Sequence, residues 1–405
     1  MGYSNGFISS LGYYEATAKT FSDICKKTSI PTKILKYYNS KNILPSGNDL
    51  DIICDKYEIT EDYLKLKMGI IDYSLIEKLQ YNAKKINEEI EKTNIKENKK
   101  FNDIKIVFDT DKGILYQGDC LDVMAGIQSD SIDMIFADPP FNLDKLYPSA
   151  MNDKIKEEEY IKWSESWIKE CIRILKPGGS FFTWNLPQWN SRFSGLLHGR
   201  MTFRHWIATD IKYSMPIKGR LYPSHYSLLY YIKGEKANVF NADRMAAQVC
   251  PKCFFDIKDY GGHKHKMNPL GISLTDVWSD IPPVRHQKYK KREGSNELSI
   301  KLLDRIIELS TNENDVIFDP FGGAGTTYVV AEMKNRRWLG CEIDSCDIIS
   351  DRFADLNDEK RYLNEIRSNY NNLFPPKIKT EREKRGLWTA ESVKKKHEEK
   401  HSIKN

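Results

Sequence analysis

Acidic side chains follow short apolar runs at several points along the chain. Asp119 follows "GILYQG", Asp138 follows "IDMIFA" and Asp319 follows "DVIF", while Glu342 and Asp344 come at and just after the end of "RRWLGC". Short apolar runs that alternate with amphipathic helical patterns are typical of a mostly parallel sheet covered by helices on both faces. Because ligands bind beyond the carboxyl ends of such strands, these carboxylates are predicted to converge on one edge of the sheet.

The segment after the second run reads "FADPPFN" and has the groups needed to activate an amine. The exocyclic amino group of a nucleobase is a weak nucleophile because its lone pair is delocalised into the ring. Asp138 and the carbonyl of Pro139 can each accept one hydrogen bond from such an amine, while Pro139 and Pro140 fix the turn in advance. Phe141 offers a face on which a flipped base can stack. The alternative interpretation is an ordinary loop with a capping acid and a buried ring.

The segment "DPFGGAGTT" (319–327) predicts a turn at which a ligand approaches the backbone closely. Gly322, Gly323 and Gly325 can adopt positive φ and allow close backbone approach between a strand and a helix. A phosphate-binding loop would need a lysine after its last glycine, but Thr326 follows Gly325 here. A cationic or zwitterionic adenosine compound therefore fits better. Glu342 ends the next strand, about 20 residues further along the chain. That is the sequence spacing at which a carboxylate binds the ribose hydroxyls of a nucleoside in such folds.

Taken together, these segments resemble those of the DNA amino-methyltransferases that use S-adenosylmethionine. The resemblance covers about residues 113–355 and also includes "GDCLDVM", "LKPGGSFFTWN", "HYSLLYYIKG" and "NELSIKLLDRII". The catalytic segment precedes the cofactor segment, which is the order of the beta class. The resemblance implies an α/β fold with a Rossmann-like methyltransferase sheet that is circularly permuted.

The resemblance also implies a role for individual residues. Asp119 would contact the adenine of the cofactor, Glu342 would bind its ribose, and Ser299 would open a helix near its methionine moiety. The implied catalytic residues are Asp138, Pro139, Pro140 and Phe141. The implied cofactor-binding residues are Asp119, Asp138, Asn296, Ser299, Asp319, Phe321, Gly323, Gly325, Thr326, Glu342 and Asp344.

Asp138 also bears on the choice of acceptor base. In this family an aspartate before the two prolines favours N6 of adenine, whereas cytosine-N4 enzymes more often have serine there. We therefore predict a site-specific methyltransferase for adenine N6 in duplex DNA, acting by base flipping and direct transfer without a covalent enzyme intermediate. Methylation of cytosine N4 on the same scaffold is the first alternative. A DNA-binding regulator without catalysis, and a methyltransferase for RNA or a protein glutamine, are more remote alternatives.

Residues 1–72 are predicted to form a separate all-α domain. The stretches "SDICKKTSIPTKILKYYNSKNILPS" and "NDLDIICDKYEITEDYLKLKMG" resemble the layout of repressor-type helix-turn-helix domains. That resemblance would direct Thr32, Lys33, Lys36 and Tyr37 into the major groove of DNA. The alternative is a small helical domain that binds another protein.

The remaining boundaries follow from changes in composition. Residues 73–100 are predicted to form a linker helix, which could also dimerise, and residues 101–375 the methyltransferase domain. Within that domain, about 241–292 is the predicted target-recognition insert. Residues 376–405 form a charged tail that is predicted to be loosely ordered.

The insert carries two groups of residues with a predicted function. Cys250, Cys253, His263 and His265 could complete a tetrahedral site for a structural zinc ion, although histidines among lysines could instead contact phosphate. Cations interleaved with aromatic rings can neutralise phosphates and stack on bases. The predicted DNA-binding residues of this kind are Arg285, His286, Lys288, Lys290, Lys291 and Arg292.

Composition restricts the class of protein. The chain has 405 residues, of which 40% are hydrophobic and 29% charged, as in a globular protein that works in water. Its eight cysteines are scattered apart from one C-x-x-C pair, so a disulfide scaffold is excluded and the reducing cytoplasm is the expected location. No apolar run approaches the ~20 residues of a membrane span. Double-stranded DNA is the predicted partner, and a homodimer and a cognate restriction nuclease are left open.

Overall fold

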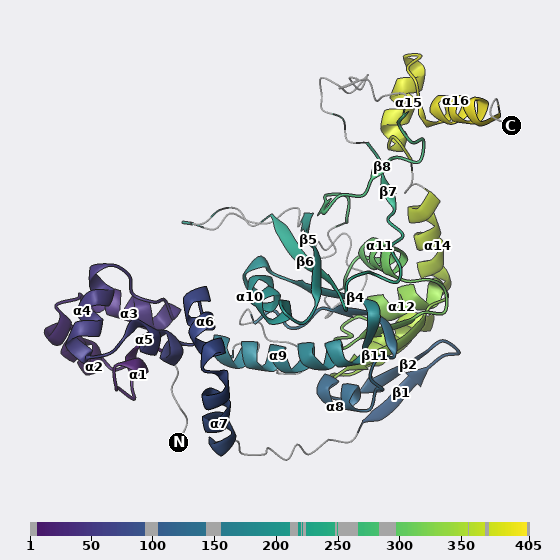
Figure 1. Cartoon of the computed structure of the whole chain (residues 1–405). Coiled ribbons are helices and arrows are strands. Elements are labelled where there is room, and N and C mark those ends of the chain that lie inside the picture. The colour runs from purple at the N-terminus through teal and green to yellow at the C-terminus, as the bar shows by residue number, and fades with distance from the viewer. Residues whose placement is uncertain are drawn as a thin grey trace. The chain divides into compact units, whose positions relative to one another are not determined.

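The computed structural model describes residues 6–93, 104–142, 155–210, 218–219, 221, 224–247, 249, 266–282, 297–354, 356–368 and 372–402. The chain divides into two compact units, Met1–Lys99 and Lys100–Asn405, and both are drawn in Figure 1. Each unit is described by itself below.

The first unit is entirely helical where the structure describes it. Thr17 and Thr60 each accept a hydrogen bond from the backbone at a helix start, and Gly69 ends a helix in the left-handed conformation. Phe21, Leu35 and other apolar side chains form one buried core. The helices are α1 (Phe7–Ser10), α2 (Ala18–Thr28), α3 (Thr32–Lys41), α4 (Asn48–Tyr57), α5 (Glu61–Met68), α6 (Tyr73–Tyr81) and α7 (Ala83–Thr93).

Helix α3 buries one side and exposes the other. Leu35 is fully buried, whereas the four predicted DNA-contacting side chains of this helix are exposed: Thr32, Lys33, Lys36 and Tyr37. The predicted single linker helix is wrong in one respect, because α6 and α7 are separate helices. Asn82 lies between them, and its side-chain amide donates a hydrogen bond to the Lys78 carbonyl, 2.9 Å away, which caps the end of α6.

The second unit is built on a sheet that has nine strands among the described residues, in the order β1-β2-β11-β10-β3-β4-β6-β5-β9. The strands from β2 to β4 in this order are parallel, and β6 runs antiparallel between β4 and β5. The strands are β1 (Lys105–Asp109), β2 (Gly113–Gln117), β3 (Ile132–Ala137), β4 (Leu175–Asn185), β5 (Thr202–Asp210), β6 (His225–Ile232), β7 (Arg244–Met245), β8 (Ile272–Ser273), β9 (Val277–Trp278), β10 (Val316–Asp319) and β11 (Arg337–Glu342).

Helices cover both faces of this sheet, as the alternation along β3 illustrates. Met134 and Phe136 pack in one core with side chains of α11, α12 and α14, whereas Ile135 and Ala137 pack in another with side chains of α8, α9 and α10. The helices are α8 (Cys120–Ala125), α9 (Glu157–Ile174), α10 (Pro187–Leu197), α11 (Ile300–Ser310), α12 (Thr326–Met333), α13 (Asp347–Ala354), α14 (Leu356–Ser368), α15 (Pro376–Lys384) and α16 (Ala390–Ser402). The predicted α/β sheet with helices on both faces is confirmed.

The charged tail differs from its prediction, because it folds into α15 and α16 (Figure 1). Its few apolar side chains, Trp388 among them, pack with Leu373 and Phe374, which precede α15, and with Ala247 of the insert. The prediction failed because the tail contributes only part of this small core, and the remainder comes from distant parts of the chain. Within the described residues, none of the helices is both long and apolar enough to cross a lipid bilayer.

Candidate active site

The connections of the sheet diverge between β10 and β3. These two strands are parallel neighbours, with Ile317 beside Met134 and Phe318 beside Ile135. From β10 the chain passes through α12 to β11 on one side, and from β3 it passes through α9 to β4 on the other. Such a divergence opens a crevice beyond the carboxyl ends of the two strands, and this is where ligands bind in open α/β sheets. The two predicted chemical segments, 138–142 and 320–325, are the turns that leave these strands.

Asp319 organises the glycine-rich turn from the end of β10. One carboxylate oxygen accepts a hydrogen bond from the Phe321 amide at 2.9 Å, and the other accepts one from the Thr327 hydroxyl. The Tyr328 hydroxyl donates to the Asp319 carbonyl at 2.9 Å. Asp319 is only 2% exposed, so its carboxylate is fixed in place before any ligand arrives.

The glycines of the turn are required by its shape. Gly323 and Gly325 have φ of 53° and 70°, in the left-handed region that side chains disfavour. Gly322 does not have a positive φ; it is required instead by close packing, because a Cβ atom there would lie 2.9 Å from the Tyr328 hydroxyl. A Cβ atom on Gly325 would also lie 2.8 Å from Cγ2 of Ile349. The Gly323 amide donates a hydrogen bond to the Glu342 carboxylate at 2.7 Å. The backbone fold of the turn thus brings the carboxylate at the end of β11 directly beside it.

Asp119 and Asp344 lie near Glu342 because β2 and β11 are parallel neighbours, with Gln117 beside Glu342. Asp119 caps α8, and its side chain accepts from the Leu121 amide at 2.8 Å. The Asp344 amide donates to Glu342 at 2.9 Å, and its carbonyl accepts from the Gln117 side chain at 2.9 Å. Three acidic residues predicted from the sequence therefore share one stretch of the sheet edge.

Acidic side chains are gathered at this edge of the sheet. Burial raises the pKa of Asp319 well above its usual range, and the charges of Asp138 and Glu342 raise it further, while hydrogen bonds from Thr327 and Phe321 oppose the shift. Burial likewise raises the pKa of Glu342. Asp319 and Glu342 form no ion pair with any residue that the structure describes. Asp138 thus lies close enough to affect Asp319, as expected from the pairing of β3 with β10, although the two residues are far apart in the chain.

The 138–142 loop is held from behind by side chains of α9 and α10. The Tyr160 hydroxyl donates to the Pro140 carbonyl, and the Trp189 indole donates to the Phe141 carbonyl at 2.7 Å. The Asn142 side chain exchanges two hydrogen bonds with the Ile155 backbone, each 3.0 Å long. Among the described residues, the Pro139 carbonyl has no hydrogen-bond partner. This leaves it as the acceptor predicted beside Asp138.

An aromatic cluster backs the same loop. The Phe141 ring, 9% exposed, lies 6.0 Å from the Tyr226 ring between centroids, and Tyr226 lies 5.0 Å from Trp184. On the cofactor side, Phe321 packs against Trp167 at 5.2 Å. The supporting tryptophans were not predicted, because their role depends on contacts between distant elements rather than on a motif.

Arg352 of α13 ties the glycine-rich turn to its surroundings and was also missed. It is 2% exposed, and its guanidinium donates to the Ala324 carbonyl at 3.0 Å and to the Thr326 hydroxyl at 2.7 Å. It also bonds Glu359 at 3.2 Å and pairs with Glu297 at 3.8 Å. Arg352 therefore joins the turn to the segment that leads into α11. Ser299, which caps α11 with its backbone, is buried there.

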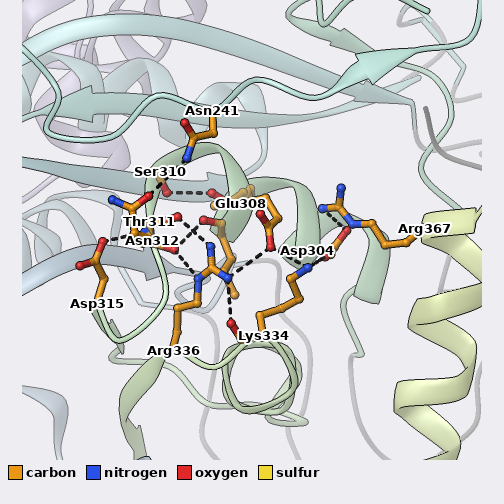
Figure 2. A network of polar contacts seen from close by, with 12 residues as sticks. Asn241, Asp304, Glu308, Ser310, Thr311, Asn312, Asp315, Lys334, Arg336 and Arg367 are labelled. Atoms are coloured by element: carbon orange, nitrogen blue, oxygen red, sulfur yellow. Dashed lines mark hydrogen bonds and ion pairs between the residues drawn. The ribbon is translucent and has the colours of Figure 1, made fainter. Parts of the chain in front are cut away.

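A second cluster of charged residues, drawn in Figure 2, lies at the opposite, amino edge of the sheet, where Asp315 and Arg336 directly precede β10 and β11. Arg336 bonds Glu308 at 3.3 Å and donates to the Thr311 carbonyl at 2.7 Å, and Lys334 pairs with Glu308 at 2.6 Å. Arg367 pairs with the fully buried Asp304 at 2.6 Å. Asp304 and Glu308 thus each face two cations, and these ion pairs join α11 to α14 and to the residues that end and follow α12. The depression that several of these side chains line, about 510 Å³ in volume, is separate from the crevice.

Several predicted site residues lie outside the described residues. They are the possible zinc ligands Cys250, Cys253, His263 and His265, the basic residues Arg285, His286, Lys288, Lys290, Lys291 and Arg292, and the cofactor residue Asn296. Within the described part of the chain, no cluster of three or more His, Cys, Asp or Glu side chains has the arrangement of a metal site.

Comparison with known proteins identifies the class to which this site belongs. The model of the N6/N4 methyltransferase family, described as DNA methylase, matches residues 132–350, which is more than half of the chain. The protein therefore belongs to the N6/N4 family of DNA methyltransferases.

The similar proteins match this chain over different lengths. The type II methyltransferase M.BamHI of Bacillus amyloliquefaciens is 45% identical over 391 residues, covering 96% of this chain and 92% of that protein. The DNA adenine methyltransferase YhdJ of Escherichia coli K12 is 31% identical over 245 residues, covering 59% and 81%. Among solved structures, the cytosine-N4-specific PvuII DNA methyltransferase is similar with a TM-score of 0.43 at 18% identity, covering 62% of this chain and 94% of that one.

Proposed function

We propose that this DNA methyltransferase transfers a methyl group from S-adenosylmethionine to the exocyclic N6 of adenine in duplex DNA. The observation that carries the proposal is that β3 and β10 are parallel neighbours, so the loop that carries Asp138 and the turn that follows Asp319 leave the same edge of the sheet side by side. A loop with two amine acceptors thereby faces a turn that is shaped for close approach of a ligand. The family supplies the reaction class, and Asp138 is the reason for naming adenine.

The residues around the glycine-rich turn fit the chemistry of this cofactor. A sulfonium and an ammonium group are cationic, and the crevice holds Asp319 and Glu342 without a cation from the described residues. Each carboxylate oxygen of Glu342 accepts a hydrogen bond from one backbone amide. Each oxygen also keeps a further lone pair that can accept a hydrogen bond from a ribose hydroxyl. Phe321, Gly323 and Gly325 would form the wall of the pocket, with Asp119 near the adenine. When bound, the cofactor supplies an electrophilic methyl group.

The 138–142 loop would prepare the acceptor. Asp138 and the Pro139 carbonyl each accept a hydrogen bond from the amino group, which draws the nitrogen toward tetrahedral geometry and localises its lone pair. Tyr160 and Trp189 bond the next two carbonyls and hold the loop in this geometry beforehand. Acceptors fixed in advance do not need to reorganise during the reaction, which is the main source of such electrostatic catalysis. Phe141 would stack on the flipped base.

Cytosine N4 is the second candidate acceptor. Its amino group presents the same two N–H donors, so the pair of acceptors at Asp138 and Pro139 would serve it equally. The alignment with the adenine methyltransferase YhdJ covers 59% of this chain, whereas the alignment with M.BamHI covers 96% of it. Similarity to YhdJ therefore supports the common catalytic unit more than it supports the choice of base.

Mass spectrometry of nucleosides tests both candidates at once. Duplex plasmid DNA is incubated with the full-length protein and S-adenosylmethionine that carries a trideuterated methyl group, and is then digested. We expect labelled N6-methyldeoxyadenosine. Labelled N4-methyldeoxycytidine instead would make cytosine the acceptor, and the absence of any labelled base would contradict the proposed function.

The first unit is proposed to add DNA binding through a helix-turn-helix. Thr32, Lys33, Lys36 and Tyr37 are exposed on α3 while Leu35 is buried, which supports a helix with one free, basic face. Replacing Lys33 and Lys36 by Gln should weaken DNA binding and lower its salt dependence by about two counterions. Replacing exposed Lys84 and Lys85 of α7 by Gln is the matched control. Equal DNA affinity in both variants would contradict the proposed DNA-binding face.

The wider setting follows from the relatives. Several similar proteins are type II methyltransferases, among them M.BamHI and M.BglII, which supports a role in a restriction-modification system beside a cognate nuclease. A cytoplasmic location suits a DNA-modifying enzyme. The structural zinc ion and the homodimer stay predictions from the sequence.

A further inference from the structure

The C-terminal tail and the insert pack together as one body. Ala247 of the insert donates a backbone hydrogen bond to the Leu373 carbonyl at 2.8 Å, and both side chains are buried with Phe374. Figure 1 shows α15 and α16 at the same end of the second unit as β7 and β8. The partly buried side chains around this small core come from both segments: Val249, Met267, Ile378, Trp388, Ala390 and Val393.

A buried arginine fixes the two tail helices to this core. Arg382 is fully buried, and its guanidinium lies 4.3 Å from the Phe374 ring and 4.5 Å from the Trp388 ring. Its Nε donates to the Trp388 carbonyl at 2.8 Å. The two ring centroids are 5.2 Å apart, so the guanidinium lies against both rings and is held by cation–π attraction as well as by packing. The turn between α15 and α16 is therefore set by specific contacts.

The base of this body is fastened to the rest of the unit. Arg367 of α14 donates a hydrogen bond to Asp243, near the start of the insert, at 2.9 Å. It also pairs with Asp304 of α11 at 2.6 Å, and both of these residues are labelled in Figure 2. The Asn241 amide donates to the Leu309 carbonyl of α11 at 2.8 Å. The start of the insert and the helix that precedes the tail are therefore both attached to α11.

Positive charge is concentrated in these two segments. Residues 241–292 contain ten Lys and Arg against five Asp, and residues 376–405 contain ten Lys and Arg against five Glu. The whole chain has a net charge of +5, so all remaining residues together carry a net charge of −5. Two adjacent basic segments repel each other, and a polyanion that binds to both of them offsets this repulsion.

We infer that the tail belongs to the target-recognition region, and that α15 and α16 bind the phosphate backbone of duplex DNA alongside the insert. This inference rests on the proposed function, because the polyanion is the DNA substrate. The exposed lysines Lys377, Lys384 and Lys395 would make these contacts. None of the three forms an ion pair with another described residue, so their charges are available to phosphates.

The test replaces Lys377, Lys384 and Lys395 by Gln in the full-length protein. These exposed changes leave the buried core and Arg382 in place, and an unchanged melting temperature verifies this. The matched control replaces Lys112, Lys169 and Arg337 by Gln, which removes the same charge from α9 and from the amino ends of β2 and β11. Affinity for duplex DNA is measured against salt concentration, together with the affinity for the cofactor and the rate at saturating DNA.

We expect the tail variant to bind DNA on the order of tenfold more weakly, with a salt slope smaller by up to about three, since each lost phosphate contact removes about 0.9. Cofactor affinity and the saturated rate should match the wild type, and the control should bind DNA as the wild type does. Equal DNA affinity and slope in the tail variant, with active wild type, would overturn this inference alone. A wild type that neither binds nor methylates DNA would overturn the proposed function itself.

Discussion

Buried carboxylates have different partners at the two edges of the central sheet. At the carboxyl edge, Asp319 and Glu342 are held by backbone amides and a hydroxyl. At the amino edge, Glu308 faces Lys334 and Arg336 (Figure 2). Burial tends to raise the pKa of Glu308 as it does for Glu342, but the hydrogen bond from Lys334 and the charge of Arg336 bring the pKa of Glu308 below its usual value, whereas that of Glu342 stays raised.

This difference in partners distinguishes a ligand-binding site from an ion-pair cluster that stabilises the fold. A carboxylate that is already paired with a cation of its own protein has little left to offer a ligand, whereas the charged form of a buried carboxylate with a raised pKa is stabilised when a cationic ligand binds beside it. Asp304 is an intermediate case, because burial raises its pKa even though Arg367 and Lys334 lower it. The carboxyl edge is therefore expected to govern cofactor and substrate, and the amino edge to govern stability.

The largest effect is expected at Asp138. Asp138→Ala should lower the single-turnover rate of methyl transfer on the order of a thousandfold, because the amine loses a preorganised acceptor. Cofactor affinity, measured by calorimetry, should stay close to that of the wild type. A variant that transfers methyl groups at the wild-type rate would dispose of the assigned role.

Glu342→Gln should have the next largest effect. Loss of the charge should weaken cofactor binding by about 10- to 100-fold, the range for a hydrogen bond to a charged group. The matched change at the amino edge, Glu308→Gln, should leave cofactor affinity unchanged and lower the melting temperature, because Lys334 and Arg336 lose their partner. The comparison of the two edges fails if Glu308→Gln weakens cofactor binding as much as Glu342→Gln does.

Substitution of two buried arginines, Arg352 and Arg336, tests whether the place of a residue in the fold, rather than its burial, decides its effect on the KM for S-adenosylmethionine. Arg352→Lys keeps the charge but loses the forked contacts to Ala324 and Thr326, so the KM for S-adenosylmethionine should rise about tenfold with little change in kcat. Arg336 is 4% exposed and is the control. Arg336→Lys should lower the melting temperature to a similar extent and leave the KM unchanged. A similar rise in KM for both variants would mean that Arg352 has only a structural role.

The smallest effect concerns stability against pH. The pKa of Asp319 is raised by burial, so the folded state holds its proton more tightly than the unfolded state does. Stability therefore falls as pH rises from the ordinary aspartate pKa of about 4 toward the raised value. Asp319→Asn should melt several degrees higher than the wild type at pH 8 without cofactor, and this advantage should disappear in acid. A variant less stable at both pH values would contradict the burial of an ionised group.

Much of this site could be predicted from the sequence, because its chemistry lies in short segments. The alternation of apolar runs indicated the sheet, and the "FADPPFN" and "DPFGGAGTT" segments lie on neighbouring strands as the predicted convergence requires. Tyr160, Trp189 and Arg352 could not be predicted, since each acts through a contact with a distant segment and belongs to no motif. The ordered tail was missed for the same reason, because Trp388 finds its core partners far away in the chain.

A crystal structure with bound S-adenosylhomocysteine would test the shared crevice most directly. We predict its sulfur between the turn at 320–325 and the loop at 138–142, with Glu342 bonded to both ribose hydroxyls. The space between the sulfur and the Asp138 carboxylate should admit one methyl and one amino group, a separation on the order of 6 Å. A cofactor bound elsewhere, or with its sulfur directed away from Asp138, would contradict the central claim.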